Sequence, residues 1–146
     1  MRAGVTFAIA GASVLMVAGC GGGRLSHHAY VSGADAVCSA YQNKVALLTH
    51  ARTYDEVIAY TDKTLPLYMA ALDKLRALRP PSSDEPAVRR WLAADDRVAT
   101  EIGRLRDAAM RHDPAATNDA SAEMQAAGLA GTRAADALGL QSCAAP

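Results

Sequence analysis

The chain has 146 residues, with 15 basic and 15 acidic side chains and a formal net charge of zero. This balance excludes the strong positive charge with which proteins bind nucleic acid or an anionic membrane surface. Hydrophobic residues make up 51% of the chain and aromatic residues only 5%, a composition that suits one domain with a core of its own.

The first nineteen residues have the three parts of an export signal. Arg2 supplies the positive start, residues 3–17 form an uncharged and mostly apolar run, and short side chains occupy residues 17–19. The apolar run is at or below the roughly 18 to 20 residues that span a bilayer, so a membrane-spanning helix is the weaker interpretation. The sequence therefore predicts export, with residues 1–19 as a signal peptide.

The residues at the end of this signal separate a lipoprotein from an ordinary secreted protein. Val17-Ala18-Gly19-Cys20 resembles the lipobox of bacterial lipoproteins, in which a diacylglycerol is joined to the cysteine thiol and the signal is cut immediately before it. The resemblance implies cleavage between Gly19 and Cys20 and a lipid anchor on Cys20, at the extracytoplasmic face of the cell membrane. We expect residues 20–33 to form a flexible tether with a random-coil reach of about 20 Å.

Lipidation would also explain the odd number of cysteines. With Cys20 used by the anchor, Cys38 and Cys143 remain, and two distant cysteines in an oxidising exterior favour a disulfide. A metal pair or a reactive nucleophile are the alternatives. Cys38 has no CxxC partner and Cys143 has no neighbouring His or base in the sequence, so we predict the disulfide.

From residue 34 onward every clear periodic pattern is helical, and no segment shows sustained alternation of β-branched residues. We predict a first helix over residues 34–51 with one apolar stripe. A capping box from Thr53 to Glu56 opens a second helix. Pro66 lies inside this helix and removes an amide donor, so we expect a kink near residues 62–66.

Two further helices follow a break at Pro80-Pro81. Ser82 is the expected cap of the third helix, in which Asp95 interrupts an apolar seam. We expect Asp95 to lie at the edge of the buried face without a functional role. The fourth helix begins at Pro114 or as late as Asn118 and ends at Leu138. Because it has few large apolar side chains, we expect it to depend on the disulfide.

Short loops between four helices predict an all-α, antiparallel (up-down-up-down) four-helix bundle over residues 34–146. An even number of helices brings the start of the first and the end of the fourth to the same end of the bundle. The Cys38–Cys143 disulfide can therefore close this bundle, whereas three antiparallel helices would hold the two cysteines a helix length apart. The same end receives the tether and would face the membrane.

Several motifs together make the chain similar to a family of small, Ala- and Arg-rich lipoproteins common in actinobacteria. Besides the lipobox, they are Cys38-Ser39-Ala40-Tyr41, Pro80-Pro81, Trp91-Leu92 and the closing Leu138-Gly139-Leu140-x-x-Cys143. Each is a packing or processing feature. The resemblance thus implies location and fold, and no activity.

The sequence contains no catalytic constellation of recognisable spacing, so we expect neither enzyme activity nor a cofactor. His27-His28 is the best metal-like pair, but two adjacent histidines in a flexible tether would bind metal only weakly.

The aromatic residues are the remaining candidates. With Trp91 they could line an inter-helix pocket near Pro66, although a plain aromatic core is the favoured interpretation; the residues concerned are Tyr41, Tyr54, Tyr60 and Tyr68. We therefore predict an envelope lipoprotein that binds another envelope protein or the cell-wall environment. Small-molecule binding near Pro66 is the alternative.

Overall fold

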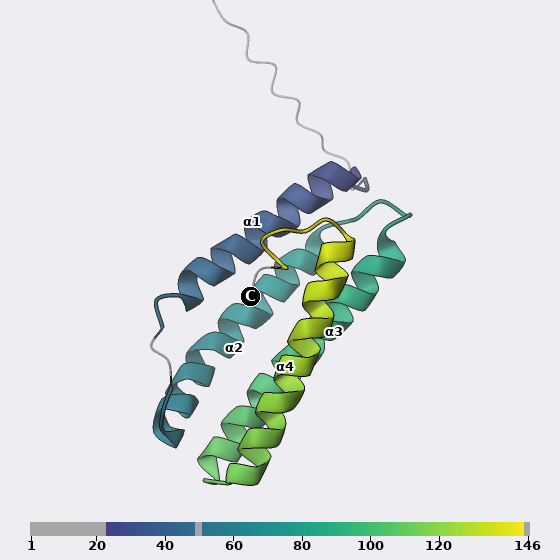
Figure 1. Ribbon diagram of the computed structural model, residues 1–146. Helices are drawn as coiled ribbons and strands as arrows, with labels where there is room; N and C mark the ends of the chain where they lie inside the picture. Colours follow the sequence, from purple (N-terminus) through teal and green to yellow (C-terminus); the bar gives the residue numbers. More distant parts are fainter. Residues whose placement is uncertain (1–22, 49–50, 145–146) are drawn as a thin grey trace, which may run out of the picture.

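Four antiparallel helices make up the part of the chain that the computed structural model describes, residues 23–48 and 51–144. They are α1 (His27–Val45), α2 (Tyr54–Ala77), α3 (Glu85–Met110) and α4 (Pro114–Ala137). Successive helices run in opposite directions (Figure 1), so the predicted up-down-up-down bundle is confirmed. None of these helices combines the length and apolar character needed to cross a membrane. The signal peptide and Cys20 lie outside the described residues.

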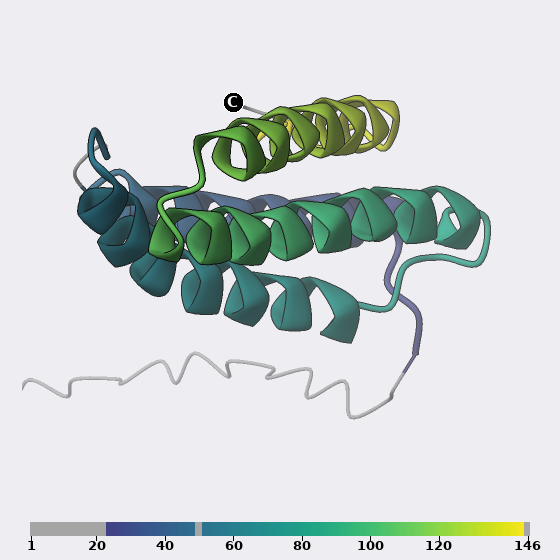
Figure 2. The same cartoon turned by 90° about the horizontal axis from the view of Figure 1, so that it is seen from below.

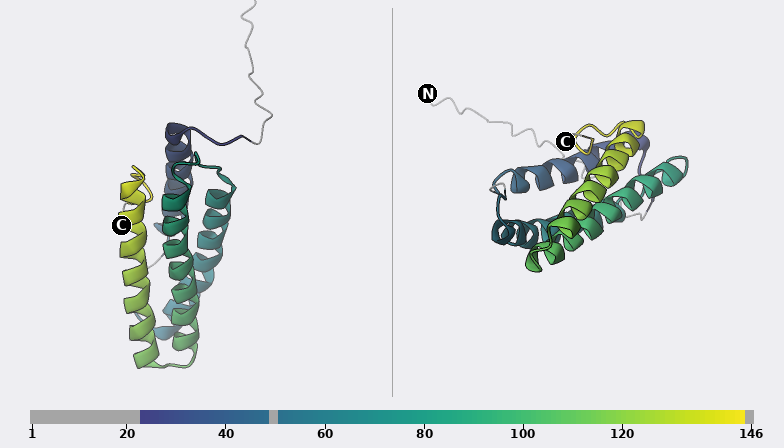
Figure 3. Two further views of the ribbon diagram at one scale, coloured as in Figure 1. Left: turned by 90° about the vertical axis from the view of Figure 1, so that its right-hand side faces the viewer. Right: turned by 60° about the horizontal axis from the view of Figure 1, so that its bottom comes forward.

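The helices pack in chain order and leave one side of the bundle open. α2 packs against α1 and α3, and α4 packs most extensively on α3. Figures 2 and 3 show α2 and α4 on opposite sides of α3. Within the described ranges, α1 and α4 have no close backbone approach. A gap therefore separates the first helix from the last.

The first helix begins earlier than expected. The predicted start at residue 34 is wrong, since residues 27–33 of the expected tether are helical. The Ser26 hydroxyl accepts a hydrogen bond from the Ala29 N–H at 3.2 Å and caps the helix. Tyr30 and Ala34 are completely buried and extend the apolar stripe toward the N-terminus. The helix also ends before residue 51, at Val45.

The segment before α1 is fastened to the loop between α2 and α3. The Leu25 N–H donates to the Arg79 carbonyl at 2.7 Å, and Arg24 forms an ion pair with Glu85. His27 Nδ1 lies 2.7 Å from an Asp84 carboxyl oxygen. The expected flexible tether through residue 33 is therefore wrong from Arg24 onward, because these contacts hold the backbone against the domain.

The starts of α2 and α3 are set by different contacts. The capping box is confirmed, because Thr53 accepts from the Glu56 N–H at 3.3 Å and Glu56 accepts from the Thr53 N–H at 3.0 Å. The helix continues without interruption through Pro66, and the kink stays a prediction. α3 begins after Asp84 instead of Ser82. The Asp84 side chain bonds to His27 and Ser83, so it does not cap its own helix.

The fourth helix starts at Pro114, the earlier of the two expected positions. Asp113 accepts from the Ala116 N–H at 3.0 Å and caps it. Its buried residues are all small, which lets it approach α3 closely along its length; they are Ala120, Ala127, Gly131 and Ala135. We expected this helix to depend on the disulfide; its extensive packing on α3 gives it a second support.

The chain reverses direction after α4. Gly139 has a φ of +78°, a conformation that side-chain-bearing residues rarely adopt. Its N–H donates to the Asp136 carbonyl at 2.9 Å and the Leu140 N–H donates to the Ala135 carbonyl at 3.0 Å, the pattern of a Schellman motif. Leu138 and Leu140 are buried in the core at this end. Residues 138–144 then fold back toward α1 (Figure 1).

A disulfide and a hydrogen-bonded carboxylate hold this C-terminal tail against α1. The Cys38–Cys143 bond is confirmed, with the two Cα atoms 5.2 Å apart. Cys38 lies past the middle of α1 and not in its first turn, because the helix starts earlier than predicted. The Asp35 carboxylate accepts from the backbone N–H groups of residues 141, 142 and 143 at 3.1, 2.8 and 3.3 Å.

Candidate functional site

The gap between α1 and α4 contains a cleft of about 850 Å³. All four helices and the C-terminal tail contribute to its lining, which is mostly apolar. The cleft exists because α1 packs on α2 only, while α4 packs on α3 through small side chains. Both the volume and the apolar lining are typical of sites that bind small organic molecules.

The floor of the cleft belongs to the core of the domain. Leu72, Leu75 and Trp91 line it and are at most 3% exposed to solvent. Tyr41 and Tyr68 lie lower on the α1 and α2 side, with their rings edge to face and the centroids 5.3 Å apart. On the α4 side, Gly128 lines the cleft and an alanine-sized Cβ there would meet no atom within 4 Å. The floor is therefore buried and apolar, and the α4 wall leaves space.

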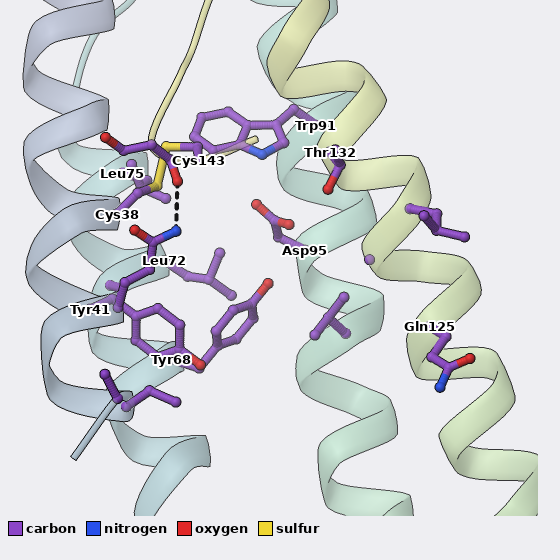
Figure 4. A pocket seen from close by; sticks show the side chains of 18 residues that line it. Cys38, Tyr41, Tyr68, Leu72, Leu75, Trp91, Asp95, Gln125, Thr132 and Cys143 are labelled. Atoms are coloured by element: carbon purple, nitrogen blue, oxygen red, sulfur yellow. Dashed lines mark hydrogen bonds between the residues drawn. A yellow bond between two sulfur atoms is a disulfide. The ribbon is translucent and has the colours of Figure 1, made fainter. Parts of the chain in front are cut away.

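Asp95 is the only residue in the described lining that carries a charge near neutral pH. Figure 4 shows its carboxyl group pointing from α3 into the space between Trp91 and Tyr68. The Tyr68 hydroxyl hydrogen-bonds the carboxyl. Within the described part of the chain, no basic side chain forms an ion pair with Asp95. A Cβ on Gly131 would lie 2.8 Å from Asp95 Oδ1, so α4 carries its smallest residue where the carboxyl lies.

Burial controls the protonation of these groups. It raises the pKa of Asp95 to about 6, the Tyr68 hydrogen bond opposes that rise, and the neighbouring Asp96 carboxylate adds to it. Burial also raises the pKa of the Tyr41 hydroxyl to about 12 and raises the pKa of Tyr68. Both tyrosine hydroxyls are therefore neutral hydrogen-bonding groups at physiological pH. The Asp95 carboxyl, in contrast, changes its protonation state at a pH close to the physiological range.

The raised pKa of Asp95 predicts a stability that increases in mild acid. The folded state holds this proton more tightly than the unfolded chain, whose Asp pKa is near 3.9. The contribution of Asp95 therefore becomes more favourable as the pH falls through 6 and levels off below about 4, a gain of about 3 kcal/mol. Asp95→Asn should remove this dependence and unfold at higher urea concentration than the wild type at pH 7.5.

Urea unfolding at pH 7.5 and at pH 5.0 measures this difference between the two proteins. Asp119→Asn is the control, since Asp119 is exposed on α4 and its loss should change stability by less than about 0.5 kcal/mol. An equal pH dependence in wild type and Asp95→Asn would contradict the prediction.

The structure brings together only part of the aromatic set singled out in the sequence. Tyr41, Tyr68 and Trp91 line the cleft, whereas Tyr54 and Tyr60 do not. Tyr54 packs edge to face on His112, with the ring centroids 4.9 Å apart.

The cleft is also not beside Pro66. That residue lines a smaller depression of about 390 Å³ between α2 and α3, where Arg106 forms an ion pair with Asp62 at 2.5 Å. The aromatic residues were predicted to line a pocket near Pro66, and this location is wrong, because the cleft that they line does not include Pro66. The α4 residues that line the cleft are Gln125, Gly128, Leu129 and Thr132, and Gly128 is the one that leaves space there.

Other candidate residues lie away from the cleft or at its edge. His27 contacts Asp84 and His28 is exposed. In residues 23–48 and 51–144, no three His, Cys, Asp or Glu side chains are grouped as a metal site would require. Cys38 and Cys143 do line the cleft, as a disulfide. Sequence reasoning missed Gln42 and Thr132, whose polar groups line it from α1 and α4.

Asp95 lies at the edge of the buried face, as expected, and is partly exposed there. What the sequence did not indicate is that this edge borders the cleft beside Tyr68. Comparisons of the chain with protein-family models, with curated proteins and with solved structures gave no match.

Proposed function

We propose that this protein is a lipid-anchored binding protein of the cell envelope whose cleft between α1 and α4 holds an apolar small molecule. The observation that carries the proposal is the cleft itself, with its volume of about 850 Å³, its buried floor of Leu72, Leu75 and Trp91 and its few polar groups. It favours the small-molecule alternative over a protein partner, because a concave site of this volume can contact a small ligand on several sides.

The lipobox resemblance and the fastened N-terminal segment support a position close to the membrane. Residues 24–27 are held against the α2–α3 loop by the contacts of Arg24, Leu25 and His27. A lipid on Cys20 would therefore be separated from Arg24 by four residue steps, which can span at most about 14 Å. The domain would sit with the α2–α3 loop toward the bilayer, close to a source of apolar molecules.

The walls of the cleft are built to keep their shape. The disulfide and the Asp35 hydrogen bonds fix the tail to α1, and the Gln42 side chain donates to the Ser142 carbonyl at 2.7 Å. The floor comes from α2 and α3, which pack directly on each other. A preformed site loses little conformational entropy when a ligand binds, and this small entropic cost favours binding.

Filling the cleft from α4 tests the proposal. Gly128→Leu should place a side chain in the empty space and weaken the binding of a neutral apolar naphthylamine dye by at least about tenfold, since it competes for the same volume. The soluble chain from Gly21 onward suits this experiment, because the core and all described contacts lie in residues 23–144. Trp91, the only tryptophan of the sequence, lies in the floor and reports binding by its fluorescence.

Gly103→Leu is the matched control. Gly103 is also a helix-interior glycine whose Cβ would meet no atom within 4 Å, but it lines the small depression near Pro66 and not the cleft. Both variants should gain about 0.5 to 1 kcal/mol of stability from helix propensity. Only Gly128→Leu should lose the dye. If the wild type does not bind it, or if both variants bind it as the wild type does, the proposal is wrong.

A further inference from the structure

We infer that the cleft selects an organic cation, a molecule with an apolar body and one ammonium group that pairs with Asp95. This inference rests on the proposed function, because it assigns a ligand class to the same cleft. Its basis is the chemistry of the lining: one carboxyl group within an otherwise uncharged and largely apolar site.

The carboxyl group is partly buried at the side of the cleft and has no cationic partner among the described residues. Ionised carboxylates away from water are normally paired with a cation or bound by several donors. Asp95 has one hydroxyl donor, Tyr68, and no ion pair within the described residues. The nearest carboxylate in the sequence, Asp96, has its own partner in Arg76. A ligand ammonium group would supply the missing opposite charge.

The aromatic rings around Asp95 fit the same ligand. Figure 4 places its carboxyl between Trp91 and Tyr68, with Tyr41 beyond Tyr68. Aromatic faces attract ammonium groups through their quadrupoles, and Trp and Tyr are the strongest of these. The combination of one carboxylate with aromatic side chains therefore recognises a cation through two independent interactions. An anionic amphiphile would meet only repulsion from the carboxylate.

Among the groups that lie around Asp95 on the four helices, Asp95 is the one that we expect to titrate between pH 5 and 7.5. Tyr68 on α2 contacts it, Tyr41 on α1 lies beside Tyr68, and Asp96 adjoins it on α3. From α4, Gly131 adjoins it and Thr132 lines the cleft, and neither titrates. Because burial raises the pKa of Asp95 to about 6, mild acid converts the carboxylate to a neutral acid that cannot pair with a cation.

Three ligands of equal chain length test the inference on the soluble chain: octylammonium, 1-octanol and octanoate, each below its micelle concentration. Titration calorimetry and Trp91 fluorescence give the affinities. At pH 7.5 we expect octylammonium to bind about tenfold more tightly than octanol and octanoate to bind most weakly. Between pH 7.5 and pH 5.0 the octylammonium affinity should fall about tenfold, because Asp95 becomes protonated, while the octanol affinity should stay constant.

Asp95→Asn should bind octylammonium about as weakly as octanol and lose the pH dependence. Asp96→Asn is the matched control: it removes the same charge one residue away, where the carboxylate is paired with Arg76, and it should keep the preference for the cation. The thermal unfolding of each variant verifies that it is folded.

The possible failures are distinguishable. If none of the three ligands binds, the proposed function fails and the inference fails with it. If octanol binds as tightly as octylammonium, the cleft holds apolar molecules but the assignment to cations is overturned. Tightest binding of octanoate, or an unchanged cation preference in Asp95→Asn, also overturns it.

Discussion

Replacing both Cys38 and Cys143 by serine should lower the free energy of unfolding by about 4 kcal/mol. The two residues are separated by 105 positions in the sequence, so the bond closes a loop that includes almost all of the domain. Without it the unfolded chain gains the conformational freedom of that loop. For a small domain whose total stability is about 5 to 15 kcal/mol, this is a large fraction.

Hydrogen bonds around the disulfide should keep the C-terminal tail partly attached to α1 when the bond is lost. Asp35 still accepts three backbone N–H groups of the tail, and Ser39 still donates to the Ser142 hydroxyl at 2.9 Å. The variant should therefore keep its helical circular dichroism at 25 °C, while its tail leaves α1 more readily and the cleft binds the naphthylamine dye more weakly.

Urea unfolding of the soluble chain, with and without reductant, measures the stability change. Reduced wild type and the double serine variant should agree, since both lack the covalent bond. The oxidised wild type should show no free thiol after denaturation, because Cys20 is absent from this chain. A loss below about 1 kcal/mol would contradict the chain-entropy argument for this bond.

Cys20→Ser should move the protein from the membrane fraction to the soluble fraction or leave it as an uncleaved precursor. The lipobox resemblance implies that the lipid is attached to this thiol, and a serine hydroxyl does not replace it in that reaction. A diacyl anchor holds a protein stably at a bilayer, whereas none of the described helices has the length and apolar character to span one.

Expression of the full chain in a bacterium that processes lipoproteins, with a labelled fatty acid, measures this effect. The wild type should carry label and sediment with membranes, and Cys20→Ser should do neither. Cys38→Ser is the control, because it removes the disulfide and keeps Cys20 as a label acceptor. Unchanged membrane partition of Cys20→Ser would refute the lipoprotein interpretation.

Helix ends show why sequence prediction succeeded at some positions and failed at others. The Thr53–Glu56 capping box and the Asp113 cap depend on contacts within three residues, so the local sequence contains all the information. The cap of α3 was misplaced because Asp84 bonds to His27, which is 57 residues away. The start of α1 was missed although its Ser26 cap is local, and its first turn is held in addition by His27 on Asp84, far away in the sequence.

The residue types of the candidate site could likewise be recognised from the sequence, whereas their arrangement in space could not. Tyr41, Tyr68 and Trp91 were recognised as possible pocket residues, but the place where they meet depends on how α1 packs. Asp95 was assigned to the edge of a helix face, since its position on α3 does not reveal which helices leave space beside it. The location of the cleft away from Pro66 could not be predicted for the same reason.

The sequence by itself determined the four helices, their antiparallel order, the starts of α2 and α4, and the pairing of Cys38 with Cys143. Helical periodicity, capping and chain parity are properties of short segments and of their number, so they can be derived without coordinates. Only the tertiary structure decided that α1 and α4 stay apart, that the tail folds back to α1, and that Asp95 points into the resulting cleft. These features depend on which small side chains allow close packing between distant segments, and that balance is set by the whole assembled core.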